Sequence, residues 1–214
     1  MRIKRLVMAG LVTLLAPTLV FAHPHIFAEA RLEVASDDKG EVSELRNVWR
    51  FDELFSASVV LDFDKNSNAT LDPDELAEVG QTVLESLSEY NYYTTALENG
   101  KSIKVNKPEH ITVDYKDGQL LMIFAVKPAE PMPLKGKLSF GVYDPTMYTA
   151  MDFPTDDDLT VVGDKITACE HKVVRPDPDE VLAENKDTLT DAFWSDPTGT
   201  DMSKLFATRI EITC

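Results

Sequence analysis

Long hydrophobic runs are scarce in this chain, and the one clear example lies at the N-terminus. Residues 6–19 are predominantly apolar, three basic residues precede them, and the Val-Phe-Ala that follows suits a cleavage site. This pattern is typical of a secretory signal peptide that is removed after Ala22. No later stretch approaches the roughly 18 apolar residues of a helical membrane span, and no cysteine directly follows the cleavage point to carry a lipid. We therefore predict an exported, periplasmic protein without a direct membrane anchor.

Basic residues are also few. The chain has 21 Lys and Arg against 37 Asp and Glu, and removal of the signal leaves 18 against 37, a net charge of −19. A surface of this sign repels nucleic acid and anionic lipid, so we expect no nucleic-acid partner. The 192 residues that remain, 23–214, suit a single domain.

Common catalytic motifs are missing. The sequence has no GxSxG, no HExxH and no glycine-rich phosphate loop. The many acidic residues make chance carboxylate pairs, so no such pair is informative. We predict that the protein is not an enzyme. One enzymatic alternative is a copper oxidase with an N-terminal histidine brace, which needs a second well-placed histidine that the sequence does not locate.

Cysteine is limited to Cys169 and Cys214. In an oxidising compartment the simplest expectation is one disulfide that ties the last residue to an upstream strand. It would close a loop of about 45 residues, which the chain-entropy model values at roughly 4 kcal/mol. The alternative is a pair of thiolate ligands in a metal site. No CxxC spacing accompanies them, and His171 is the one histidine nearby in the sequence.

A stretch rich in oxygen donors, Asp64–Leu76, matches the loop of an EF-hand in its spacing. Calcium takes six to eight oxygen ligands, and alternate short acidic or amide side chains, one main-chain carbonyl and a closing glutamate supply them. Leu71 would turn inward to the apolar floor. The expected calcium ligands are Asp64, Asn66, Asn68, Thr70, Asp72 and Glu75.

The flanks of this loop predict two helices. Asp72 is an N-cap, Pro73 follows it at the first helical position, and Glu75 closes a capping box. Apolar residues spaced by three and four then predict a helix from Pro73 to about Tyr90. A shorter helix should begin near Asp52, so a helical insert is expected at about 52–90.

Ala69 is the one departure inside the loop, because it stands at the sixth position, where the sharp turn normally takes glycine. An alanine held at positive φ costs roughly 1 kcal/mol. We therefore expect weak calcium binding, with a dissociation constant on the order of 10⁻⁴ to 10⁻³ M. The alternative is a polar turn between two helices that binds nothing.

Cleavage after Ala22 would make His23 the first residue of the mature chain, with His25 close behind it. An N-terminal histidine offers its α-amine and Nδ1 as a chelate, and a second imidazole adds to it. Pro24 excludes the square-planar copper site that needs a deprotonated amide at the second residue, because proline has no N–H. The pattern suits Zn, Ni, Co or Cu. The alternative is that both histidines simply begin the first strand.

Short alternating runs separated by turn residues fill the remainder and predict paired strands. We expect hairpins at 26–51, 111–126 and 159–174, a further strand at 135–143, and a last strand at 209–214. Together they indicate an α+β fold: an antiparallel β-sandwich or curled sheet with an inserted EF-hand-like helix-loop-helix.

Several of these stretches together resemble one uncharacterised family. They are His-Pro-His-Ile-Phe at 23–27, the run Val48–Ser56, the loop 64–76, Val142–Thr146 and the terminal cysteine. That family is a domain of unknown function, often labelled the periplasmic component of an ABC-type transport system. Its members are often found beside, or fused to, metal permeases of the nickel/cobalt type. The resemblance implies a metal-linked role with an inner-membrane metal permease as partner.

Two positions depart from the family pattern. Ala69 stands for glycine in the loop, which lowers the expected calcium affinity. Met147 stands after Asp-Pro-Thr, where tyrosine would be expected, and nothing in the sequence explains it.

Two functions follow as hypotheses. The leading one is a periplasmic metal-binding accessory protein linked to transition-metal transport, which holds or hands over the metal through His23 and His25. The loop then either carries calcium or serves as a structural hairpin. The alternative is a calcium-stabilised interaction module of the cell envelope in which the histidines have no metal role.

Overall fold

The longest strand, β1 (Ile26–Ser36), lies inside the larger of two sheets. The computed structural model describes residues 24–190, 193 and 202–214. β1 pairs with β2 (Val42–Phe51) as an antiparallel hairpin, as predicted. Asp37 closes the turn between them, because its carboxylate accepts from the backbone N–H groups of Lys39 and Glu41. Alternate side chains along β1 are buried, so one face of the hairpin enters the core.

The first sheet continues on both sides of this hairpin in the order β5-β6-β2-β1-β8, with β9 also on β1. β5 (Thr112–Lys116) and β6 (Gln119–Val126) form the second predicted hairpin. β8 (Thr149–Asp152) and β9 (Leu159–Val162) both run parallel to β1. The predicted hairpin at 159–174 is therefore wrong, because β9 pairs with β1 and its expected partner joins the other sheet.

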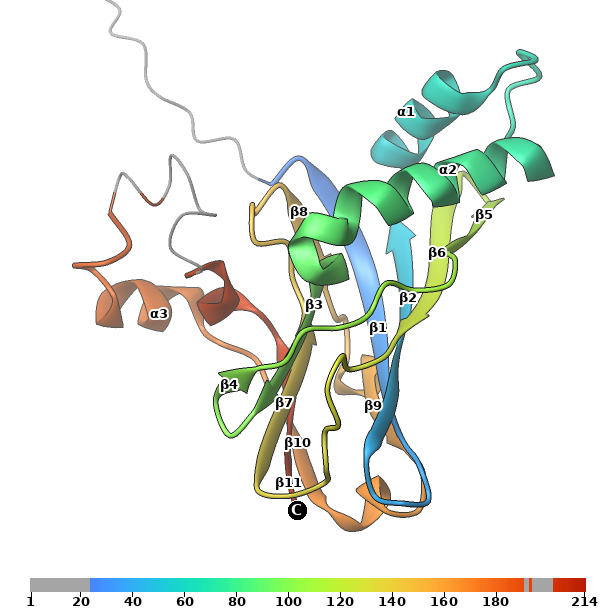
Figure 1. Ribbon diagram of the computed structural model, residues 1–214. Coiled ribbons are helices and arrows are strands. Elements are labelled where there is room, and N and C mark those ends of the chain that lie inside the picture. The colour runs from blue at the N-terminus through green and yellow to red at the C-terminus, as the bar shows by residue number, and fades with distance from the viewer. Residues whose placement is uncertain (1–23, 191–192, 194–201) are drawn as a thin grey trace, which may run out of the picture.

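The second sheet is antiparallel throughout, in the order β10-β11-β7-β3-β4. Its strands, in chain order, are β3 (Thr94–Glu98), β4 (Lys101–Ser102), β7 (Lys137–Val142), β10 (Glu170–Val174) and β11 (Arg209–Thr213). The chain thus has a mixed α+β fold, mostly strands in two sheets with few helices (Figure 1).

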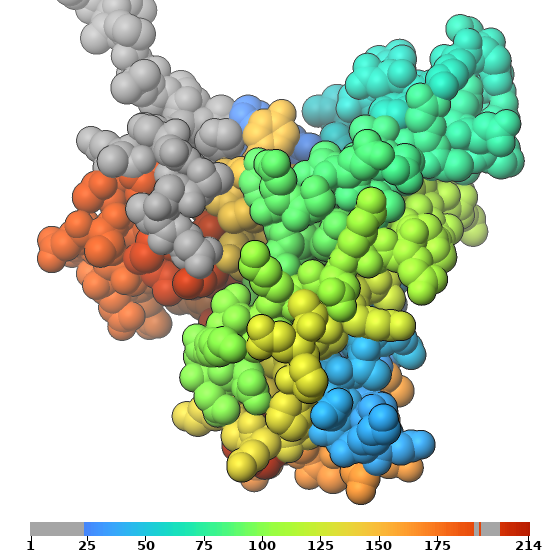
Figure 2. Space-filling view, viewed as in Figure 1, coloured from blue at the N-terminus to red at the C-terminus, as the bar shows by residue number. Residues whose placement is uncertain are grey.

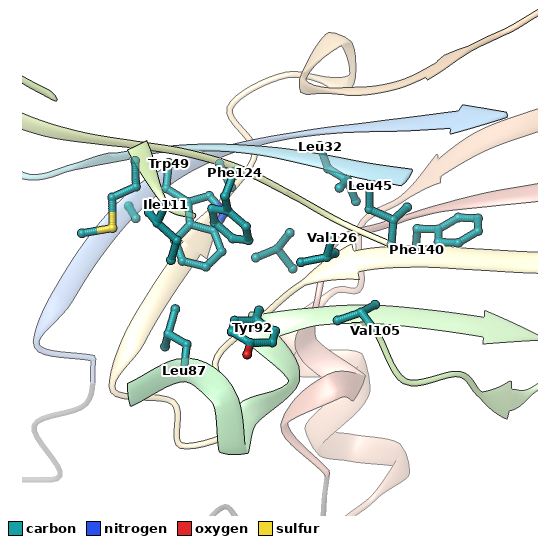
Figure 3. Close-up of a cluster of buried hydrophobic side chains, with 14 of the residues drawn as sticks. Leu32, Leu45, Trp49, Leu87, Tyr92, Val105, Ile111, Phe124, Val126 and Phe140 are labelled. Atoms are coloured by element: carbon teal, nitrogen blue, oxygen red, sulfur yellow. The ribbon is translucent and has the colours of Figure 1, made fainter. Parts of the chain in front are cut away.

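One apolar core receives side chains from both sheets and from the segment that follows the second helix (Figure 3). Trp49 lies in it with its ring edge on Phe124, at a centroid separation of 4.8 Å. Other members shown in the close-up are Leu32, Leu45, Leu87, Tyr92, Val105, Ile111, Val126 and Phe140.

Two helices cross the end of the first sheet. α1 (Glu53–Phe63) begins at its N-cap Asp52, and α2 (Pro73–Ser86) begins at the predicted capping box before passing into the 3₁₀ segment η1 (Leu87–Tyr93). α2 packs very closely on the chain ahead of β5, since a Cβ added to Gly80 would lie 2.4 Å from the carbonyl oxygen of Ile111. α1 and the loop after it stand out from the body in teal in Figure 2.

The chain after β8 also contains short helices. These are η2 (Asp156–Asp158), η3 (Ile166–Ala168), α3 (Pro178–Glu184) and η5 (Ser203–Phe206). The first two contact β9 of the first sheet, and the last two contact each other. Cys169 and Cys214 form the predicted disulfide across a separation of 45 residues. The alternative of a two-thiolate metal site is therefore wrong. Among the described residues, no helix is long and apolar enough to span a membrane.

We predict that the Cys169→Ser/Cys214→Ser double variant loses about 4 kcal/mol of unfolding free energy, because its unfolded chain no longer contains the closed loop. Urea denaturation of the signal-cleaved protein measures the loss. Reduced wild-type protein is the matched control and should unfold at the same urea concentration as the double variant. A double variant as stable as the oxidised wild type would contradict the prediction.

Candidate functional site

The loop between α1 and α2 turns sharply at two left-handed residues. Ser67 has φ 59° and Ala69 has φ 63°. Ala69 thus adopts the backbone conformation expected at the sixth position of the loop, and its N–H donates to Oδ2 of Asp64 at 2.7 Å. The alanine carries the strain that a glycine there would avoid.

Side chains at alternate loop positions are joined by direct hydrogen bonds. Oδ1 of Asp64 and Oδ1 of Asn66 both accept from the backbone N–H of Asn68 at 3.1 Å. The amide nitrogens of Asn66 and Asn68 donate to Oδ2 of Asp72, at 2.7 Å and 3.1 Å. The Asn68 side-chain oxygen accepts from the N–H of Thr70 at 3.0 Å. Three of the six predicted ligand side chains, Asn66, Asn68 and Asp72, are therefore hydrogen-bonded to one another, and a fourth, Asp64, accepts from the loop backbone.

Glu75 fastens the two ends of this loop. Its side chain is only 5% exposed, and its two oxygens accept from the backbone N–H groups of Lys65 and Asp72, both at 2.8 Å. The second bond completes the capping box of α2. The Lys65 ammonium pairs with Glu78, and Leu71 is buried under the loop as predicted.

The loop as described is satisfied by its own hydrogen bonds. Within the described ranges, no group of three or more His, Cys, Asp and Glu side chains is arranged to hold a metal ion, so the carboxylates of Asp64, Asp72 and Glu75 do not form one. The donor set is nonetheless all oxygen, from two carboxylates, two amides and the closing glutamate, which is the ligand chemistry that calcium prefers. These oxygens now accept hydrogen bonds from N–H groups, and a cation would have to take the place of those donors.

The predicted transition-metal residues are only partly within the described chain. His23 lies outside it. His25 is exposed just ahead of β1, and its ring lies 4.8 Å from that of Tyr148, centroid to centroid. The backbone N–H of His25 donates to the Tyr148 carbonyl at 2.8 Å. His110 and His171 are exposed on other segments.

A buried carboxylate that the sequence did not single out organises the turn beside His25. Asp144 is 3% exposed and accepts from the N–H groups of Thr146 at 2.8 Å and Thr149 at 2.9 Å. Burial first, and the nearby charge of Asp144 second, raise the pKa of Tyr93 well above its usual value. The only sequence signal was the Asp-Pro-Thr turn. Met147, the unexplained departure from the family pattern, has φ 58° in this turn.

A strained segment leads into β3. Asn91, Tyr92 and Tyr93 all have positive φ, at 51°, 53° and 53°. The Asn91 side chain supports this conformation, since its amide nitrogen donates to the Thr94 carbonyl at 2.6 Å and its oxygen accepts from the Val105 N–H at 3.0 Å. No pattern in the sequence predicts this turn. It places the Tyr93 ring against the buried ring of Trp49 and next to Asp144.

Comparison with models of protein families identifies the family of this chain. The model of a family described as proteins of unknown function, DUF1007, matches residues 8–214. The chain belongs to the DUF1007 family. The resemblance to an uncharacterised family is thereby confirmed, whereas the association of this DUF1007 protein with nickel/cobalt permeases stays a prediction.

Two relatives share sequence with this DUF1007 protein. An uncharacterised protein of Haemophilus influenzae is 25% identical over 200 residues, covering 91% of this chain and 92% of the relative. An uncharacterised 15.5 kDa protein from the trpE 3′ region of Spirochaeta aurantia is 28% identical over 95 residues, which is 44% of this chain and 68% of the relative.

Among solved structures, AChBP from Bulinus truncatus aligns with 89% of this chain and 87% of its own at 8% identity, with a TM-score of 0.36. At that score the likeness carries no argument about fold or function.

We predict that Ala69→Gly raises the unfolding free energy of the metal-free protein by up to about 1 kcal/mol, because glycine adopts positive φ without the clash of a Cβ. Urea denaturation in the presence of a chelator measures the change.

The matched control for this prediction is Ala77→Gly, at an exposed position inside α2. There the same substitution should lower stability by about 1 kcal/mol, since glycine is a poor helix former. Equal losses in both variants would show that the strain at Ala69 is not relieved.

Proposed function

We propose that this protein is an exported interaction module of the cell envelope, in which loop 64–75 binds calcium weakly and fixes α1 relative to α2. The observation that supports the proposal best is the curvature of the loop. Around left-handed Ser67 and Ala69, the side chains of Asn66 and Asn68 donate to the Asp72 carboxylate. The Asp64 carboxylate accepts from the backbone N–H groups of Asn68 and Ala69 in the same loop. That spacing and that oxygen chemistry are those of an EF-hand-like site.

The negative charge of the helical insert favours the binding of calcium. Residues 52–90 contain ten Asp and Glu and a single Lys, a net charge of −9. That lysine, Lys65, pairs with Glu78, and so it does not neutralise the loop carboxylates. Repulsion among like charges in this hairpin favours a bound divalent cation, which lowers the local charge by two.

Glu75 links cation binding to the position of the helices. It already joins the first residue after Asp64 to the start of α2. A cation held by Asp64, Asp72 and the carbonyl of Thr70 would draw on the same glutamate. Binding would then stabilise the angle between α1 and α2 rather than add a separate element.

Export to the periplasm belongs to the same proposal. The disulfide between Cys169 and Cys214 is typical of an oxidising compartment. The signal pattern at residues 1–22 lies outside the described structure, and its cleavage after Ala22 stays a prediction.

We predict that about 10 mM calcium raises the unfolding free energy of the signal-cleaved protein by roughly 1 to 3 kcal/mol, as follows from a dissociation constant on the order of 10⁻⁴ to 10⁻³ M. Glu75→Gln should abolish most of the increase, because the amide still caps α2 but is a poor calcium ligand. Thermal and urea unfolding with and without EGTA measure the effect.

Asp74→Asn provides the matched control, since Asp74 lies in the same first turn of α2 but is not among the expected ligands. It should keep the calcium response within a few tenths of a kcal/mol, as is usual for an exposed surface substitution. If calcium stabilises neither wild type nor Asp74→Asn, the loop is a polar turn and the calcium part of the proposal fails.

The second candidate is the transition-metal accessory function, with a metal permease of the inner membrane as partner. One observation favours it: His25 is exposed at the start of β1, where a mature N-terminus at His23 would be within two residues of it. The α-amine and imidazoles at that end suit Zn, Ni, Co or Cu.

We predict that placing one extra residue ahead of His23 weakens transition-metal binding at least about tenfold if the α-amine is a ligand. Calorimetric titration of metal-stripped protein with Zn²⁺, Ni²⁺, Co²⁺ and Cu²⁺ measures it. His171→Ala is the control for nonspecific imidazole binding and should leave the affinity unchanged. An unchanged metal affinity in the extended variant would show that the α-amine is not a ligand.

A further inference from the structure

The outward side of α1 is apolar and uncovered in the described chain. Leu54 is 82% exposed and Leu61 is 85% exposed, the two highest values among the exposed large hydrophobic side chains. Ala57 is exposed between them. Spacings of three and four residues place all three on one side of the helix over about 10 Å. We call Leu54, Ala57 and Leu61 the outer face of α1.

The outer face of α1 takes no part in packing the helix against the core. α1 attaches to the first sheet through its opposite side, where Ser56, Val59 and Val60 are buried. The Ser56 hydroxyl accepts from the backbone N–H of Leu120 at 2.9 Å, which fixes the rotation of the helix. Single exposed leucines are ordinary, but the two most exposed ones on one face of one helix form a patch.

A further exposed apolar residue, Phe27 on β1, lies near the start of α1. Phe27 is 54% exposed. Its backbone N–H donates to the Asp52 carboxylate and its carbonyl accepts from the Asp52 N–H, both at 2.9 Å, so it lies beside the first turn of α1. Figure 2 shows the teal segment that carries α1 and the following loop projecting at the upper right of the molecule.

Acidic groups surround this patch. Glu53 and Asp62 are exposed on α1 itself, and the whole insert carries a net charge of −9. A second copy of the chain would bring an equally acidic surface against it, and an anionic membrane would be repelled in the same way. A ligand that covers the leucines has to be positively charged around its own apolar side chains.

We propose that the outer face of α1 docks a cationic amphipathic segment of another protein. Leucine or phenylalanine side chains at helical spacing would cover Leu54 and Leu61, and flanking Lys or Arg would face the acidic rim. The proposal rests on the proposed function in so far as it treats the α1–α2 hairpin as the interaction element. It names the partner by its charge and its apolar spacing.

The test uses a synthetic helical peptide of about 18 residues with leucine on one face and lysine on the other, long enough to span the patch. Binding to signal-cleaved, disulfide-bonded protein is measured by fluorescence anisotropy, with and without calcium. Leu54→Ser/Leu61→Ser should weaken binding about tenfold or more. The affinity of wild type should fall several-fold between about 50 mM and about 300 mM salt, because the rim charges are screened.

Leu182→Ser is the matched control, since Leu182 is 37% exposed on α3, away from the insert. It should leave peptide affinity unchanged. The double variant should remain folded and melt within a few degrees of wild type, because both leucines are exposed and serine costs only a few tenths of a kcal/mol in helix propensity at each position.

Three results would overturn the proposal. They are equal peptide binding by wild type and the double variant, equal binding of a peptide with glutamate in place of lysine, and wild-type dimerisation or binding to anionic vesicles that the double variant lacks. Leucine-dependent peptide binding without any calcium stabilisation would uphold the docking face and reject the calcium part of the proposed function. Calcium stabilisation without leucine-dependent peptide binding would uphold the calcium part of the proposed function and reject the docking face.

Discussion

One carboxylate, Asp52, joins the sheet to everything built at its end. It accepts from the N–H of Phe27 on β1 and from the N–H of Phe55 in the first turn of α1, both at 2.9 Å. Burial disfavours its charged form, but these backbone donors together hold the pKa of Asp52 below its ordinary value. The last residue of β2 therefore passes directly into a capped helix whose direction is set by β1. The direction in which α1 leaves the sheet follows from this junction, and the packing of α2 ahead of β5 fixes the other side of the insert.

The helical insert combines two opposing tendencies. Its apolar residues bind it to the sheet through α2, closely enough that Gly80 has no room for a side chain. Its acidic residues repel one another, and the outer face of α1 remains exposed to solvent. In the loop, the side-chain amides of Asn66 and Asn68 donate hydrogen bonds to Asp72, which offsets part of the repulsion around this carboxylate. The Asp72 carboxylate thereby has hydrogen-bond donors within the loop.

Local signals in the sequence sufficed for most elements, because turns, caps and alternation act over a few residues. The β1–β2 hairpin, the capping box at Asp72 and the positive φ of Ala69 are of this kind. Pairings over long distances were not accessible: β9 reads as half of a hairpin, yet its partner is β1. The exposure of Leu54 could not be predicted for another reason, because the apolar residues of α1 are spread around the helix and no periodicity marks its inner face. Asp158 is the last of three consecutive aspartates, and no local pattern marks it as the one that is buried and pairs with Arg31.

The parallel pairing of β8 and β9 on β1 bears on the behaviour of the protein in concentrated solution. β8 covers Ile26–Glu29, β9 covers Leu32–Ala35, and η2 lies between them, with Asp158 reaching Arg31 at 3.0 Å. The longest strand of the molecule thus never presents an open row of amide and carbonyl groups. Long bare edges recruit strands from other molecules and begin aggregates. Two short strands and one ion pair close this edge, so the fold protects its central strand from the pairing that its own length would invite.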